Sequence, residues 1–143
     1  MPSASGPISS AGAIIRVRVG VHSSRAERLA SAGLGIPEPA SVSALLDTGA
    51  SLSGVDPALF TELGYDGPLD TKEIITSGGI TEASFHIVNL TILGDAPRTF
   101  PSLEVFGTDF EDHEGVRCLI GRDILDKCRL VYDGPGEVFT LSF

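Results

Sequence analysis

Residues 45–51 read LLDTGAS and place one carboxylate, that of Asp47, at the end of an apolar run. Three small residues follow: Thr48, Gly49 and Ala50. They leave room for backbone amide groups to approach the carboxylate and hydrogen-bond it. A carboxylate held in this way on the end of a strand can take up and release a proton during a reaction. Asp-Thr-Gly also forms ordinary turns, so the motif alone leaves a solvated turn open as an alternative.

A second stretch with the same design occurs far along the chain. At 118–125 the sequence reads CLIGRDIL, in which the apolar pair Leu119 and Ile120 precedes Gly121 and Arg122. The glycine leads into a predicted short helix. The two motifs together are much more specific than either alone, and the pair favours a built site over an ordinary turn.

Short strands joined by turns must position these residues. The 17 Gly and 9 Pro are interspersed with Val, Ile and Thr, which is typical of an all-β fold class. At 13–21 apolar residues alternate with Arg16 and Arg18, as in a half-buried strand. The pattern predicts strands or hairpins over 13–21, 41–46, 73–93, 101–107, 116–120 and 129–143. Ser77-Gly78-Gly79 is expected at the tip of the hairpin at 73–93.

Short helices are predicted between the strands. Ser24 and Glu27 have the spacing of a capping box, and Gly33 is placed to end the helix that they begin. Asp56 is placed to cap a second helix over 57–63. We expect the first to be a short surface helix and the second to have about two turns.

The 143 residues, 42% of them hydrophobic, can form one sizeable core. We expect a flexible segment over 1–11 and one domain over 12–143. The formal charge of −9 excludes a nucleic-acid surface, since phosphate contacts need clustered Lys and Arg. No apolar run approaches the roughly 20 residues of a membrane span, and the N-terminus lacks the features of a signal peptide. We therefore expect a soluble, cytoplasmic protein.

Metal and disulfide chemistry are not indicated. Cys118 and Cys128 are the only cysteines, and two buried free thiols are favoured over a bridge. Three histidines are scattered along the chain: His22, His86 and His113. The acidic run at 109–114 does not match the EF-hand loop, so we interpret it as a solvated loop. We expect no metal and no cofactor.

The sequence resembles the retropepsin-like (retroviral-type) aspartic proteases. Their active-site signature, an apolar pair followed by Asp-Thr/Ser-Gly-Ala/Ser, is matched by ALLDTGAS at 44–51. Their second motif, apolar-apolar-Gly-Arg-Asn/Asp, is matched by LIGRDIL at 119–125, and the glycine hairpin falls between, where the family has its flap. The closing TLSF at 140–143 is similar to the terminal interface strand. Over 14–143 the resemblance implies one acid-protease domain, a β-barrel with a flap and one short C-terminal helix.

The resemblance also implies roles. Asp47 would be half of a general acid/base dyad. Thr48 would brace two active-site loops through its hydroxyl, and the amide of Gly49 would bond the carboxylate, with Ala50 completing the loop. The flap would comprise Ser77, Gly78, Gly79 and Ile80. The second motif would be structural and comprise Leu119, Ile120, Gly121 and Arg122.

The number of motifs predicts a dimer. Aspartic-protease chemistry needs two carboxylates that share a proton, and the chain has a single Asp-Thr-Gly. A two-fold homodimer would bring Asp47 of each subunit together. We therefore expect an aspartic endopeptidase acting on peptide or protein substrates. The alternative is a catalytically silent retropepsin-like module that binds peptide or protein.

The chain departs from the family in two places. Many retroviral members have an Asp where this chain has Ser51, and that Asp pairs with the arginine of the second motif. Arg122 must therefore find another acceptor. The region 21–40 is longer than the corresponding viral connection, and we expect it to add a surface helix that alters the dimer contacts.

Ala50 leads to a pH prediction. Pepsin-like enzymes usually have Ser or Thr at this place, where a hydroxyl stabilises the ionised carboxylate. Without that hydroxyl we expect the pair to ionise at a higher pH, giving an activity optimum at about pH 4 to 6. A pH profile of peptide cleavage that peaks near pH 2 would contradict this.

Overall fold

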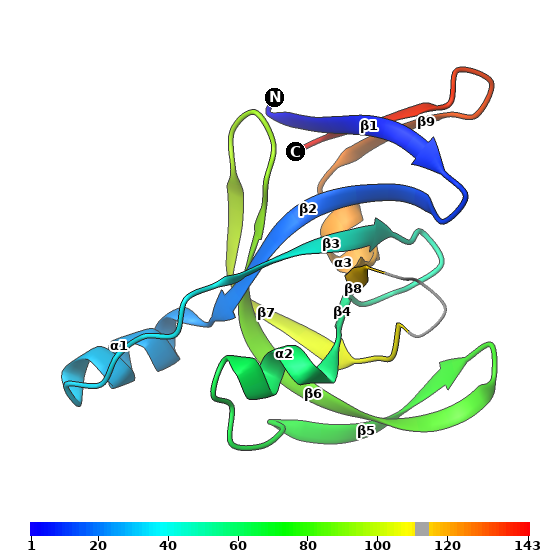
Figure 1. Cartoon of the computed structure of the whole chain (residues 1–143). Helices are drawn as coiled ribbons and strands as arrows, with labels where there is room; N and C mark the ends of the chain where they lie inside the picture. The colour runs from blue at the N-terminus through cyan, green and yellow to red at the C-terminus, as the bar shows by residue number, and fades with distance from the viewer. Residues whose placement is uncertain (111–114) are drawn as a thin grey trace.

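The computed structural model describes residues 1–110 and 115–143 and places the two chain ends close together (Figure 1). The strands are β1 (Ser3–Ser9), β2 (Gly12–Val21), β3 (Ala40–Leu46), β4 (Gly54–Val55), β5 (Asp70–Thr76), β6 (Gly79–Ile92), β7 (Arg98–Gly107), β8 (Val116–Ile120), β9 (Arg129–Asp133) and β10 (Val138–Ser142). The helices are α1 (Ser23–Ser31), α2 (Pro57–Glu62) and α3 (Arg122–Leu125). The loop predicted at 109–114, which includes His113, lies largely outside the described residues and stays a prediction.

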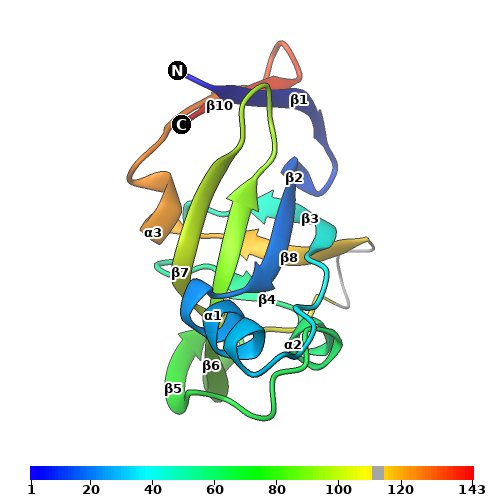
Figure 2. The ribbon, with the colours of Figure 1, turned by 90° about the vertical axis from the view of Figure 1, so that its left-hand side faces the viewer.

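Six strands close into a barrel. Their order is β2, β3, β8, β4, β7 and β6, and the pairing of β6 with β2 completes the ring (Figures 1 and 2). Two of these pairings, β3 with β8 and β4 with β7, are parallel. The protein is a mostly-β single domain, and the expected fold class is confirmed at this level.

Alternating side chains fill the barrel. In β2 the predicted pattern is confirmed, because Val17 and Val19 are fully buried whereas Arg16 and Arg18 are exposed. The same alternation in the second half of β6 and in β8 directs apolar residues inward. Members of this core that are fully buried include Val17, Val88, Leu90, Ile92, Ile120 and Ile124.

α2 follows the sequence prediction closely. The Asp56 side chain caps it by accepting a hydrogen bond from the Ala58 N–H at 3.0 Å, and Pro57 takes the first turn. Leu59 and Phe60 are buried against the barrel. Local residue types thus determine where this helix begins and which face it buries.

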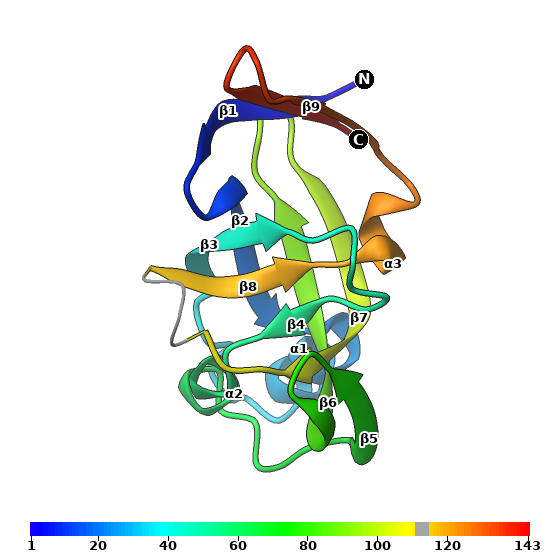
Figure 3. The ribbon, with the colours of Figure 1, turned by 90° about the vertical axis from the view of Figure 1, so that its right-hand side faces the viewer.

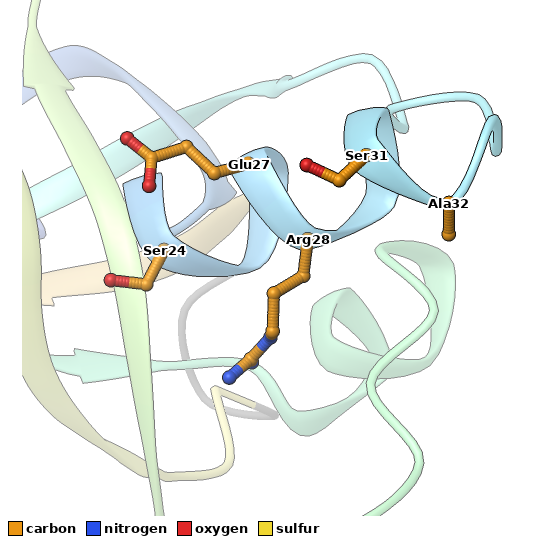
Figure 4. A pocket seen from close by; sticks show the side chains of 5 residues that line it. All are labelled: Ser24, Glu27, Arg28, Ser31 and Ala32. Carbon is orange, nitrogen blue, oxygen red and sulfur yellow. The ribbon is translucent and has the colours of Figure 1, made fainter.

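α1 begins differently from the prediction. His22 caps it, with Nδ1 accepting from the Arg25 N–H at 3.2 Å, so the expected capping box of Ser24 and Glu27 is wrong. Those two side chains instead line an open depression of about 600 Å³ along the helix (Figure 4). Gly33, at φ 72°, ends the helix as expected. α1 buries no residue and projects from the barrel (Figure 1).

The N-terminal segment is a strand. We expected residues 1–11 to be flexible, but Ser3–Pro7 pair with Ser142–Val138 of β10. The Ser3 N–H also donates to Asp95 Oδ1 at 2.7 Å. Small polar residues show little local preference here, and the pairing partner at the far end of the chain supplies the backbone hydrogen bonds that order the segment. β10 therefore lies between β1 and β9 in one layer.

The two cysteines are free thiols, as expected, although Cys128 is only partly buried. Burial raises the pKa of Cys118 to about 12, so this thiol packs as an inert apolar group. Within 1–110 and 115–143, no group of His, Cys, Asp or Glu has the arrangement of a metal site. Of the helices in these ranges, none has the length and apolar character needed to cross a membrane.

Candidate active site

Asp47 follows β3 at the point where β8 also ends. The two strands run parallel, with Leu45 opposite Leu119 and Leu46 opposite Ile120. The Asp47 N–H continues the ladder by donating to the Ile120 carbonyl oxygen at 2.9 Å. The backbone of Asp47 is therefore attached to a strand that lies far away in the sequence.

The small residues after Asp47 turn the chain around the carboxylate. The Gly49 N–H donates to Asp47 Oδ1 at 2.8 Å, and the Ala50 N–H donates to the Asp47 carbonyl oxygen at 3.2 Å. A Cβ at position 49 would lie only 3.1 Å from Oδ1, which a larger residue would crowd. The geometry agrees with the role expected for the Gly49 amide.

The second motif packs directly against this loop. The Arg122 N–H donates to the Ala50 carbonyl oxygen at 2.8 Å, and the Asp123 N–H donates to that of Ser51 at 3.2 Å. A Cβ at Gly121 would come within 2.6 Å of the Leu52 backbone, so only glycine fits there. Close approach explains why a glycine precedes α3.

Arg122 finds its acceptor in the backbone. Its Nη1 donates to the Thr48 carbonyl oxygen at 2.7 Å. A carbonyl of the Asp47 loop thus takes the place of the acidic side chain that Ser51 replaces. The Thr48 hydroxyl has no hydrogen-bond partner among the described residues, so the bracing role expected for it is not fulfilled within one chain.

A cavity of about 780 Å³ opens between the Asp47 loop and the β5–β6 hairpin. Asp47, Leu52 and Leu119 line one side of it, and the hairpin residues 73–77 line the other. Figure 3 shows the loop after β3, the tip of this hairpin and the β9–β10 hairpin on the same face of the molecule. The fold therefore places a cleft lined by both polar and apolar residues beside Asp47.

The hairpin tip matches the predicted flap in position. Ser77 and Gly78 form the turn, because Thr76 pairs with Gly79. The Thr76 hydroxyl accepts from the Gly78 N–H and donates to the Gly79 carbonyl oxygen. Ile80, beside the tip, is 71% exposed. Of the four expected flap residues, only Ser77 lines the cavity within one chain.

The sequence and fold of this chain resemble those of known proteins. A model of the aspartyl protease family matches residues 35–124. The chain belongs to the aspartyl protease family. The match includes the Asp-Thr-Gly motif, the β5–β6 hairpin and residues 119–124 of the second motif.

Two solved structures share the retropepsin-like fold of this family member. A retropepsin-like aspartic protease from Rickettsia conorii aligns over 99% of this chain and 90% of its own, with a TM-score of 0.57 and 15% identity. The protease of simian foamy virus (mac) aligns over 80% of this chain and 92% of its own, with a TM-score of 0.50 and 14% identity. At these identities the likeness concerns the fold.

Sequence reasoning missed two residues that join the motifs of this aspartyl protease. Ser53 is fully buried, and its hydroxyl donates to Asp123 Oδ1 at 2.7 Å while accepting from the Gly121 N–H at 3.1 Å. The Ser53 N–H donates to Asp123 Oδ2 at 3.0 Å. The sequence shows a serine shortly after Asp-Thr-Gly and an acidic residue after Gly-Arg. That these two side chains pair with each other depends on the fold.

Replacing Ser53 with alanine should destabilise the protein by about 2 kcal/mol, because the buried Gly121 N–H loses its acceptor and the carboxylate of Asp123 loses a donor. Denaturant unfolding measures this. Ser51→Ala, at an exposed neighbouring position, is the matched control and should change stability by less than about 0.5 kcal/mol. Equal unfolding midpoints for the two variants would contradict the prediction.

Proposed function

We propose that this member of the aspartyl protease family is an aspartic endopeptidase that works as a homodimer. The observation that carries the proposal is the position of Asp47, whose carboxylate accepts from the Gly49 amide and lines a cleft beneath the flap-like hairpin. The domain responsible spans the barrel and β1, and so begins before residue 12. Peptide or protein chains are its substrates.

The chemistry needs Asp47 from each of two subunits. Two carboxyl groups held close together share one proton, so one is ionised and the other is protonated. The ionised carboxylate takes a proton from a water molecule as the water attacks the peptide carbonyl carbon. The protonated carboxyl group polarises the carbonyl oxygen and gives it a proton. The first carboxyl group then gives the proton that it took from water to the peptide nitrogen, and the second takes a proton back from a hydroxyl of the tetrahedral intermediate as the carbon–nitrogen bond breaks.

The loop and the hairpin have supporting roles in this proposal. Thr48 braces the two loops across the dimer axis, where its hydroxyl would find the partner that it lacks among the described residues of one chain. Gly49 and Ala50 hold the carboxylate and keep space free around it. The flap residues Ser77, Gly78, Gly79 and Ile80 close over a bound peptide, which would cover the exposed Ile80 and exclude bulk water.

The face that carries Asp47 also offers a surface to a second copy. The closing strand β10 has β1 on one edge and β9 on the other, so it cannot accept a partner strand without losing one of its own. The outer edge of β9 is open at the end of the sheet, and Val131 and Tyr132 are 49% and 55% exposed there. We propose that β9 and its hairpin contact the second subunit, in place of the terminal TLSF strand.

Asp47→Asn should reduce peptide cleavage by at least about 100-fold, because an amide cannot share or transfer the proton. Cleavage-site profiling on a denatured proteome, wild type against variant, is the measurement. Asp66→Asn makes the same chemical change at an exposed position and should leave cleavage unchanged. Cleavage that persists in Asp47→Asn would overturn the proposed function, and a wild type that binds peptides without cutting would favour a silent binding module.

Activity per chain should fall on dilution, because each monomer holds half a site. Val131→Glu, which puts a charge on the open β9 edge, should shift the protein toward monomer in sedimentation analysis and lower activity in parallel. Leu69→Glu alters an exposed apolar residue that lies before β5 and outside the region 21–40, and it is the control. A monomer with undiminished activity per chain would refute the shared dyad.

A further inference from the structure

One peptide unit lies between the Arg122 side chain and the Asp47 carboxylate. Its carbonyl belongs to Thr48 and accepts from Arg122 Nη1 at 2.7 Å. Its N–H belongs to Gly49 and donates to Asp47 Oδ1 at 2.8 Å. The carbonyl and the N–H of a peptide unit share one resonance system, so a charge that acts on one group also acts on the other. A cation and an acid are therefore joined by two hydrogen bonds through a single amide.

The direction of the effect follows from the charges. A guanidinium that donates to a carbonyl oxygen draws electron density toward that oxygen and away from the peptide nitrogen. The N–H on the other side of the peptide becomes more positive, and so a stronger donor to a carboxylate. Hydrogen bonds in a chain strengthen one another by roughly 10–30% per bond, and a charged donor makes a stronger bond than a neutral one. The Gly49 N–H should therefore hold ionised Asp47 more firmly than an unassisted amide would.

The Arg122 guanidinium is not neutralised by an acidic side chain. None of the ion pairs among residues 1–110 and 115–143 includes Arg122. The carboxylate of its neighbour Asp123 is bonded elsewhere, because Oδ1 accepts from the Ser53 hydroxyl and Oδ2 accepts from the Ser53 N–H. The positive charge of Arg122 therefore acts on the Thr48 carbonyl without a carboxylate from this part of the chain to offset it.

Other contacts hold the second motif on the Asp47 loop without this side chain. The backbone N–H of Arg122 donates to the Ala50 carbonyl oxygen at 2.8 Å, and any residue at position 122 except proline keeps this bond. The hydrogen bonds between Ser53 and Asp123 also do not involve the Arg122 side chain. Arg122 is exposed, so replacing its side chain opens no cavity in the core. A substitution at this position can therefore remove the charge while α3 keeps its place.

We propose that Arg122 is a positioning residue that acts on Asp47 through the Thr48–Gly49 peptide. The proposal rests on the endopeptidase function proposed above and adds a residue to that site. In the two-fold dimer each Arg122 would assist its own subunit's Asp47, so whichever of the two carboxylates is ionised is held by a strengthened N–H. Thr48 and Gly49 are exposed in one chain, and the dimer would cover them and exclude water, which increases the effect of the charge. Arg122 itself touches neither the substrate nor the reacting atoms.

The kinetic test compares charged and neutral side chains at position 122, using a fluorogenic peptide built on a cleaved sequence from the profiling. All variants are assayed at a concentration at which sedimentation shows each to be a dimer. In Arg122→Gln, kcat should fall about fivefold while KM changes less than about twofold. Arg122→Lys should recover most of kcat, because one N–H of the guanidinium makes the contact and an ammonium can replace it. Arg18→Gln removes the same charge at an exposed position of β2 and should keep the wild-type kcat. An unchanged kcat in Arg122→Gln, or no recovery in Arg122→Lys, would overturn the proposal.

A spectroscopic measurement separates failure of this proposal from failure of the proposed function. The NMR resonance of the Gly49 amide proton reports the strength of its hydrogen bond and needs no cleavage. In Arg122→Gln this resonance should move upfield by about 0.3 ppm or more, and in Arg122→Lys it should return most of the way to its wild-type position. If wild type cuts no peptide yet the resonance moves in this way, the endopeptidase proposal fails and the action of Arg122 on the loop stands. The same Gly49 resonance in wild type and Arg122→Gln overturns the proposal even if cleavage occurs.

Discussion

β3 and β8 run parallel and end together, and the loop that carries Asp47 depends on this pairing. A parallel pair joins segments that are distant in the sequence, and here it brings the two glycine motifs into contact. Gly121 permits the approach because its missing side chain leaves room for the Leu52 backbone. The Ser53–Asp123 hydrogen bonds and the bond from Arg122 to the Thr48 carbonyl then fasten the loop on α3. The carboxylate is positioned by the barrel rather than by its own turn.

β6 joins the barrel to the β5–β6 hairpin. Its second half pairs with β2 and β7 inside the barrel, while its first half forms the flap-like hairpin with β5. At the junction His86 is buried and stacks on Phe60 with ring centres 3.6 Å apart. Burial lowers the pKa of His86, which favours its neutral form in this apolar packing. The hairpin is therefore anchored at its base, while residues near its tip, such as Ile75 and Ile80, are exposed.

Local chemistry made much of the structure readable from the sequence. Alternation identified β2, Asp56 and the proline after it identified the start of α2, and the glycine turn identified the hairpin at 73–93. The two motifs located the Asp47 loop and the residues that pack on it. These features were predictable because each depends on residue types within a few positions of one another.

Contacts between distant segments decided the rest. β1 is a strand because β10 pairs with it, and the small polar residues of the N-terminus do not indicate this strand by themselves. The side chain that caps α1 is His22 and not Ser24. Arg122 donates to the Thr48 carbonyl oxygen, whose position depends on the β3–β8 pairing. The sequence by itself determined that each chain carries one carboxylate of this kind. Only the tertiary structure placed the β5–β6 hairpin and the Asp47 loop around one cavity, because strand pairing and barrel closure set which distant segments lie together.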